Sequence, residues 1–255
     1  MQETNYTLDE AYLKATAFEA TEQIIGIQQE KILHRTLKYY LCNNDAYHEI
    51  KIKKSEKGIL YADICIDNNI YEIQTRGFNK LRDKLDEFLK DYKVTIVHPI
   101  AYKKNIYKIE GTGLISGPKK SPKTGRVFDA FKELYKIKTF LNHPNLSLKF
   151  ILLEMDEYRT VVEKKHVRSS GYIREKQIPK KIEAIYDFNS KIDYIRFLDS
   201  LNLDSEFTSL ELKKAAKVNK NLATLSLNIL TYLEVVERIG KKGNSYIYKI
   251  KRFNE

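Results

Sequence analysis

The sequence has little cysteine: its 255 residues include only two, Cys42 and Cys65. Two isolated cysteines supply neither a disulfide framework nor the ligand set of a structural zinc domain, and they fit a reducing compartment. Ten glycines and five prolines are too few for long disordered linkers, and a hydrophobic content of 42% is ordinary for a folded chain. We therefore expect a protein that is folded throughout.

Long apolar runs are also missing. No stretch approaches the roughly 18 apolar residues of a membrane span, and the first ten residues lack the basic and apolar regions of a secretion signal. We expect a cytoplasmic protein that neither enters nor crosses a membrane. The formal net charge of +11 favours polyanionic partners, although a generally lysine-rich proteome produces the same charge without any specific partner.

A β-hairpin is predicted over residues 61–76, where apolar residues alternate on both sides of the cluster Asp67-Asn68-Asn69. With Asn68-Asn69 as the two-residue turn, Cys65 pairs with Glu72 and Asp63 pairs with Gln74. Because strand periodicity is two, Asp63, Glu72 and Gln74 share one face, with Asp63 and Glu72 as diagonal neighbours about 7–8 Å apart. Adjacent carboxylates repel unless a cation lies between them, and a hard divalent metal suits oxygen ligands. The alternative is an ordinary polar outer face.

The segments around this hairpin have a clear order. Apolar spacing predicts a helix over 28–41, a strand over 47–53, a helix over 78–92 and a buried strand over 93–101. Glu30 and His34 are four residues apart on the first helix. This pair has three interpretations: a solvated surface pair, a separate Glu-His metal site, or a contribution of the helix to a site on the hairpin.

The order helix, three strands, helix, strand, with acids at Glu30 and Asp63 and the motif Glu72-Ile73-Gln74, resembles the PD-(D/E)XK, or restriction-endonuclease-like, nuclease superfamily over about residues 25–101. The resemblance implies an α/β fold with a mixed β-sheet flanked by helices. It also implies an endonuclease that uses Mg²⁺ or Mn²⁺, bound by Asp63, Glu72 and Glu30. Gln74 stands where the superfamily usually has Lys, so its role is to orient the attacking water and the chemistry rests more on the metal. His34 and Arg76 are accessory candidates, although a guanidinium cannot act as a base.

Two basic stretches follow. Residues 103–126 carry seven basic residues and one acid, a net charge of 7 − 1 = +6, and their glycines and prolines predict a loop or irregular hairpin. This stretch is either a phosphate-binding loop or a solvated run of charge, and the nuclease interpretation favours DNA contacts from Lys119, Lys120, Lys123 and Arg126. A helix over 128–141 and a strand over 148–155 come next. Residues 159–181 form the second basic stretch, which we interpret as an extended hairpin arm.

The last segment is a separate pattern of three helices followed by a hairpin with a basic tip at residues 240–245. It resembles a winged helix-turn-helix domain. That resemblance implies DNA contacts from the third helix and from the tip, made by Lys220, Asn221, Thr224, Asn228, Lys241 and Lys242. The alternative is a winged helix that serves dimerisation or packs on the first domain.

Together these patterns predict a nuclease domain at 1–187 and a winged helix-turn-helix domain at 188–255. The main hypothesis is a Mg²⁺-dependent DNA endonuclease; because cutting both strands of a duplex commonly uses two sites, a homodimer is compatible with it. The second hypothesis is a catalytically inactive, nuclease-fold DNA-binding or regulatory protein, favoured by Gln74. A third is an interaction module with a partner other than DNA.

Overall fold

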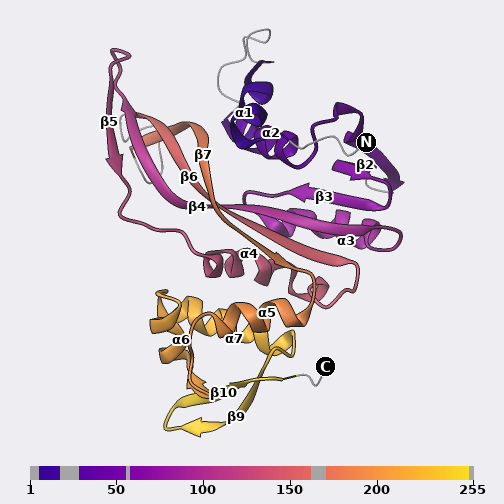
Figure 1. Ribbon diagram of the computed structural model, residues 1–255, viewed down its shortest axis with the longest axis vertical. Coiled ribbons are helices and arrows are strands. Elements are labelled where there is room, and N and C mark those ends of the chain that lie inside the picture. The colour runs from indigo at the N-terminus through magenta and orange to yellow at the C-terminus, as the bar shows by residue number, and fades with distance from the viewer. Residues whose placement is uncertain (1–5, 18–28, 56–57, 162–170, 253–255) are drawn as a thin grey trace. The chain divides into compact units, whose positions relative to one another are not determined.

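The computed structural model describes residues 6–17, 29–55, 58–161 and 171–252. The fold is mixed α/β, with a large and mostly antiparallel sheet flanked by helices and a separate three-stranded sheet (Figure 1). The predicted α/β class is confirmed at this level. The chain divides into two compact units. The first comprises Met1–Thr75, Val97–Arg126 and Phe150–Ile185, and the second comprises Arg76–Ile96, Val127–Lys149 and Tyr186–Glu255.

The first unit begins with α1 (Leu8–Ala17) and α2 (Gln29–Leu41), followed by β1 (His48–Ser55), β2 (Gly58–Ile66) and β3 (Asn69–Ile73). A short 3₁₀ turn at Asp45–Tyr47 leads into β1. The apolar stripe of α2 packs through Leu33 and Leu37 onto Ile64 of β2 and Ile73 of β3. This buried contact confirms the predicted helix and fixes it against one face of the hairpin.

The hairpin forms, but its predicted register is wrong. Cys65 pairs with Ile70 and Ile66 with Asn69, so the turn is Asp67-Asn68 rather than Asn68-Asn69. Asp67 takes a positive φ of 50°, a backbone conformation that Asp and Asn both tolerate and that tight hairpin turns require. The shift is two residues, so every side chain keeps its face. Continued in this register, Asp63 lies opposite Glu72 rather than diagonal to it.

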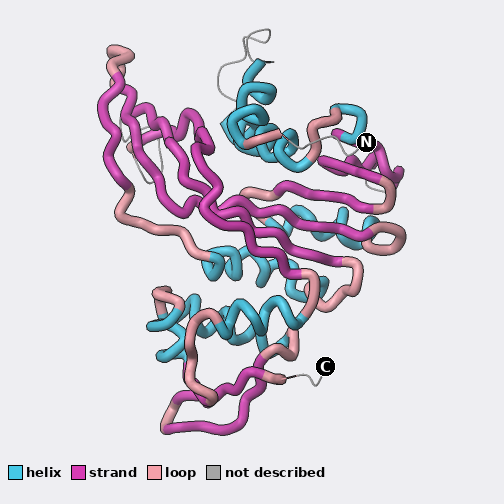
Figure 2. The backbone as a smooth tube through the Cα atoms, in the orientation of Figure 1, coloured by secondary structure: helices cyan, strands magenta, loops and turns pink. Residues whose placement is uncertain are grey.

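Three long strands and one short strand continue the sheet: the long β4 (Lys93–Ile109), β6 (Leu146–Val161) and β7 (Tyr172–Phe188), and the short β5 (Ile115–Lys120). The sheet order is β1-β2-β3-β4-β6-β7, and β5 pairs with β4. The predicted strands at 93–101 and 148–155 are therefore the buried parts of longer strands (Figure 2). The basic stretch 103–126 contains an irregular hairpin, as expected, with Lys119 opposite Ile106 and Lys120 opposite Asn105.

The helices of the second unit are more broken than the sequence predicts. Residues 78–92 contain the 3₁₀ turn Phe78–Leu81 and α3 (Arg82–Phe88). Residues 128–141 contain two 3₁₀ segments, Val127–Ala130 and Tyr135–Phe140, around the short α4 (Phe131–Leu134). The prediction of one continuous helix over 128–141 is wrong. Phe128 and Phe131 stack with ring centroids 5.1 Å apart, and 3₁₀ geometry brings residues three apart directly over one another.

The last part of the second unit comprises α5 (Lys191–Asp199), β8 (Glu206–Thr208), α6 (Ser209–Ala215), α7 (Lys220–Tyr232), β9 (Val236–Lys242) and β10 (Ser245–Ile250). The small sheet has the order β8-β10-β9. Thr208 caps α6 and forms a capping box with Glu211, as the sequence indicates. The predicted hairpin forms, but its tip is shorter than the predicted 240–245: the strands run to Lys242 and from Ser245, because Gly243 at a φ of 58° permits a two-residue turn. Among the described residues, none of the helices has the length and apolar character needed to cross a bilayer.

Candidate functional site

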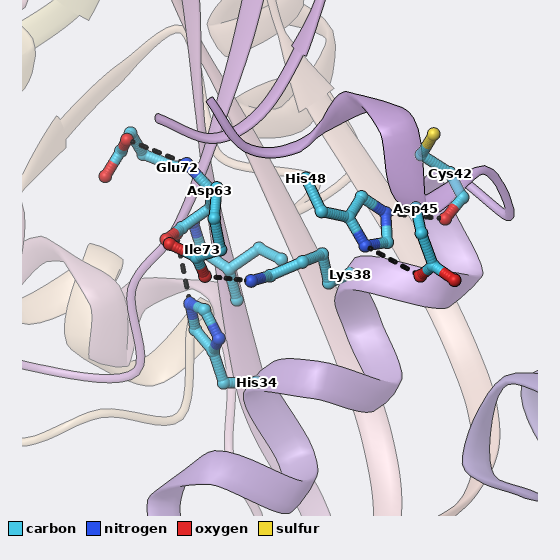
Figure 3. A network of polar contacts seen from close by, with 9 residues as sticks. His34, Lys38, Cys42, Asp45, His48, Asp63, Glu72 and Ile73 are labelled. Atoms are coloured by element: carbon cyan, nitrogen blue, oxygen red, sulfur yellow. Dashed lines mark hydrogen bonds and ion pairs between the residues drawn. The ribbon is translucent and has the colours of Figure 1, made fainter. Parts of the chain in front are cut away.

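Asp63 on β2 and Glu72 on β3 each accept a hydrogen bond from the backbone of the opposite strand. The Ile73 N–H donates to Asp63 Oδ2 at 2.7 Å, and the Asp63 N–H lies 3.3 Å from Glu72 Oε1 (Figure 3). Carboxylates here accept hydrogen bonds from the facing strand's N–H groups. The arrangement brings the two acids together on paired strands, in facing positions instead of the predicted diagonal ones.

His34 reaches this pair from α2. Its Nε2 lies 3.0 Å from Asp63 Oδ2, and since a carboxylate accepts, the ring nitrogen donates. The side chains of His34 and Asp63 are 26% and 14% exposed, so the contact is sheltered but reachable by solvent. Among the three interpretations of the Glu30–His34 pair, the geometry brings His34 to the hairpin. The side chain of Glu30 lies outside the described part of the structure.

Glu72 is 2% exposed, which is unusual for a carboxylate. Ionised side chains are costly to bury unless a donor, a cation or a metal compensates the charge. Within the described residues, no group of three His, Cys, Asp or Glu side chains is arranged to hold a metal ion. Mg²⁺, however, commonly takes only one or two protein carboxylates and completes its shell with water and substrate phosphate. The hard oxygen atoms of Asp63 and Glu72 fit that requirement.

Gln74 follows at the end of β3 and is half-buried. Its N–H donates to Val97 O at 2.8 Å, and its carbonyl lies 2.6 Å from His98 Nδ1, which must donate because a carbonyl only accepts. His98, 8% exposed, thus fixes the backbone that carries Gln74. Sequence reasoning missed His98, although it lies in the predicted buried strand. Arg76, two residues further on, is exposed and begins the next segment of the second unit.

Lys38 is a second residue that sequence reasoning missed. It lies one helical turn after His34, its side chain is only 8% exposed, and it forms an ion pair with Glu49 of β1. The sequence feature that could have identified Lys38 is its spacing of four residues from His34, which puts both on the sheet-facing side of α2. Glu49 itself takes a positive φ of 51°, so the strand deviates from regular geometry where this pair forms.

The residues predicted to bind DNA on the basic hairpin differ in exposure. Lys119, Lys120 and Lys123 are exposed, and Arg126 is half-buried. Lys119 and Lys120 extend from β5. Close to Arg126, the Gly125 N–H donates to both Ala101 O and Tyr102 O, at 3.1 and 3.0 Å, which ties the end of the basic stretch back to β4. The lysines are therefore presented on a strand and a loop that the sheet positions.

The predicted contact face of α7 is exposed in its first two turns. Lys220, Asn221 and Thr224 are exposed and, together with Asn228 and Tyr135, line a hollow of about 340 Å³. Asn228 is half-buried, and its Oδ1 accepts from Lys138 Nζ at 2.8 Å. The C-terminal half of α7 is thus bound to the 3₁₀ segment Tyr135–Phe140 within the same unit.

The β9–β10 hairpin exposes Lys241 and Lys242. Lys241 Nζ lies 4.8 Å from the ring centroid of Tyr246. Arg238, which sequence reasoning missed, lies 4.4 Å from the same ring and 5.8 Å from that of Tyr248. Cation–π contacts of this kind hold cationic side chains along the hairpin. The sequence feature that could have identified Arg238 is the alternation of basic and aromatic residues across the two strands.

Residues 31–189 match the family described as "Domain of unknown function (DUF8091)". An uncharacterized protein of Treponema pallidum (strain Nichols) is 28% identical over 132 residues, which cover 52% of this chain and 51% of that protein. This chain therefore spans about half the length of the curated relative that it matches. No solved structure matches the chain.

Proposed function

The chain belongs to the DUF8091 family, and we propose, from the chemistry of its paired carboxylates, that it is a metal-dependent endonuclease that hydrolyses phosphodiester bonds in DNA. One observation carries this proposal: Asp63 and Glu72 lie on paired strands, each accepting an N–H of the strand that faces it. The packing of α2 against this hairpin supports the assignment of a restriction-endonuclease-like site.

In this proposal Asp63 and Glu72 hold Mg²⁺ or Mn²⁺, which when bound activates water and stabilises charge on the phosphate. His34 donates to Asp63 Oδ2 and thereby fixes the orientation of that carboxylate, as groups behind a metal ligand commonly do. We assign Gln74 the positioning of the attacking water through its side-chain amide, and His98 the positioning of the backbone at Gln74. Glu30 is retained as a third acidic candidate.

DNA binding is assigned to the basic hairpin and to the C-terminal segment. We propose that α5 to β10 form a winged helix-turn-helix domain. The order helix, strand, helix, helix, strand, strand and the sheet order β8-β10-β9 support this assignment. Lys220, Asn221 and Thr224 are the exposed residues of α7 that would approach DNA, and the bond between Lys138 and Asn228 confines that approach to the first turns of the helix.

The test is nicking of supercoiled plasmid in Mg²⁺ or Mn²⁺. We expect the wild-type protein to cut, and Asp63→Asn and Glu72→Gln each to abolish cutting. Asp67→Asn is the matched control, because it removes an acid from the same hairpin at a turn position whose positive φ suits Asn. Cutting that persists in both site variants, or an absence of cutting with every metal, would refute the proposal.

A second candidate, a nuclease-fold DNA-binding protein that does not cut, is favoured by one residue, Gln74 in place of Lys. A cation at this position helps to activate water, whereas an amide neither carries charge nor accepts a proton at neutral pH. Restoration by Gln74→Lys distinguishes the two candidates. A wild-type protein that binds duplex without cutting, together with a Gln74→Lys variant that cuts, would assign the natural chain to the second candidate.

A further inference from the structure

A buried carboxylate, Glu157, lies on β6 outside the site described above. It is 0% exposed, and both of its oxygen atoms are bound. Lys104 Nζ and Gln177 Nε2 donate to Oε2 at 3.0 and 2.8 Å, and Arg174 Nε lies 3.3 Å from the same atom. Arg159 Nε donates to Oε1 at 2.6 Å, and Arg159 Nη2 lies 2.5 Å from the same oxygen.

The cluster has a surplus of positive charge. Three cations surround one anion, which leaves a net charge of 3 − 1 = +2 on side chains that neighbouring strands hold in place. Burial alone would raise the pKa of Glu157, but the charges of Arg174 and Lys104 outweigh it, and the pKa is lowered. Glu157 is therefore ionised at neutral pH and cannot neutralise more than one of its partners.

The surplus charge is accessible. The side chain of Arg174 is 45% exposed, and those of Lys104 and Arg159 are each 18% exposed. The ion pair of Arg174 with Glu157 runs through Nε, and no other acidic partner accompanies Arg174 within the described part of the chain. Arg159 is held from a second side, since its guanidinium carbon lies 4.1 Å from the ring centroid of Tyr172. Fixed and partly exposed guanidinium groups match the geometry of phosphate oxygens.

Cations occur on each of the four strands in this part of the sheet. Lys119 lies on β5 opposite Ile106 of β4 and therefore on the same face as Lys104; Arg159 lies on β6 and Arg174 on β7. At about 4.8 Å per strand, four strands extend over roughly 14 Å, a length of duplex that carries about eight phosphate charges. An acidic protein presents negative charges at irregular spacing, whereas the backbone of a nucleic acid presents them at regular spacing along its length. A row of cations across four strands therefore suits a nucleic acid better.

We propose that Lys104, Arg159 and Arg174, held in place by Glu157, form a binding surface for the phosphate backbone of DNA. This inference rests on the proposed action on DNA, but it concerns residues other than those that hold the metal. Glu157 is a positioning residue: it contacts no nucleic acid, and it keeps three mutually repelling cations in one arrangement.

The experiment measures binding of a labelled duplex by fluorescence anisotropy without metal, using the full chain in an Asp63→Asn background so that no cutting occurs. Arg174→Ala is expected to weaken binding about five- to tenfold near 0.1 M salt and to lower the salt-dependence slope by about one, as for the loss of one phosphate contact. Lys90→Ala is the control, since this lysine is 56% exposed, pairs with Glu87 at 2.9 Å and lies in a segment to which no DNA contact is assigned.

Glu157→Gln separates positioning from total charge. The substitution raises the net charge of the protein by one, so an effect of total charge alone predicts tighter binding, whereas loss of positioning predicts weaker binding. If circular dichroism shows that this variant does not fold, Arg174→Glu replaces it and is expected to weaken binding more than Arg174→Ala. Unchanged binding in Arg174→Ala, tighter binding in a folded Glu157→Gln variant, or equal binding of polyglutamate would overturn the proposal.

Failure of this inference differs from failure of the proposed nuclease. If the wild-type protein cuts plasmid and Arg174→Ala binds DNA as tightly as wild type, the binding surface is refuted and the proposed nuclease stands. If the wild-type protein never cuts and Arg174→Ala weakens duplex binding, the binding surface is supported and the proposed nuclease is refuted.

Discussion

Asp63→Ala is expected to destabilise the first unit as well as to remove a metal ligand. Asp63 Oδ2 accepts the N–H of Ile73 at 2.7 Å, and Ile73 is only 2% exposed, so water cannot replace the lost acceptor. A hydrogen bond to a charged group contributes about 1.5–3 kcal/mol, and the partly exposed contact with His34 adds at most about 1 kcal/mol. The expected loss is therefore about 2–4 kcal/mol.

Asp63→Asn is the matched variant. Its side-chain oxygen can take the place of Oδ2 and accept from both Ile73 and His34, but as a neutral instead of a charged acceptor, so we expect a loss of about 1 kcal/mol. Thermal and urea unfolding followed by circular dichroism measures both variants, and at about 2–4 °C per kcal/mol the alanine variant should unfold roughly 4–16 °C lower.

Metal adds a second measurement to the same experiment. Mg²⁺ at 100 times its dissociation constant should stabilise the wild-type protein by about 2.7 kcal/mol and should stabilise neither variant. An alanine variant as stable as wild type would show that Asp63 is an ordinary surface acid. Equal stabilisation of all three proteins by Mg²⁺ would refute the assignment of Asp63 as a ligand.

Two further predictions concern stability. In Gly125→Ala the new Cβ would lie 2.3 Å from Ala101 O, a backbone atom that cannot move aside easily, so unfolding should become easier by about 1–3 kcal/mol, measured by urea denaturation; Gly240→Ala, with no heavy atom within 4 Å, is its control. The lowered pKa of Glu157 means that its contribution to stability is fully present above the ordinary value of 4.5 and is lost as the pH falls through the lowered value. The free energy of unfolding, measured against pH, should therefore fall more steeply below pH 4.5 in wild type than in Glu157→Gln. Parallel curves for the two proteins would contradict this.

Local patterns in the sequence predict the hairpin well. Alternation identifies which residues share a face, and because a register shift of two preserves every face, the error in the turn left Asp63 and Glu72 on one face while it changed their predicted diagonal positions to facing ones. The position of the turn could not be decided, since Asp67, Asn68 and Asn69 all tolerate a positive φ. The packing of Leu33 and Leu37 was predictable for a similar reason: helical spacing alone determines their common face.

Residue contacts across long sequence separations were not predictable. Glu157 is bound by Lys104, 53 residues before it, and by Gln177, 20 residues after it, and no local pattern relates these positions. Its contact with Arg159, two residues away, is consistent with strand alternation, but alternation does not indicate that the carboxylate is buried. The prediction of one helix over 128–141 was wrong for another reason: its apolar spacing suits both α and 3₁₀ geometry, so spacing alone does not choose between them.

The two acidic clusters of the first unit differ in the sign of their surplus charge, and this difference argues for a phosphodiester substrate. Asp63 and Glu72 place two carboxylates on paired strands, and His34 contacts only the first of them, so the cluster attracts a cation. Glu157 brings one carboxylate to three cations, so that cluster attracts an anion. A protein that only binds DNA has use for the second cluster and none for the first. Glu72→Gln should therefore leave duplex affinity unchanged while it abolishes nicking, and weakened binding in that variant would mean that the carboxylates serve the fold rather than the metal.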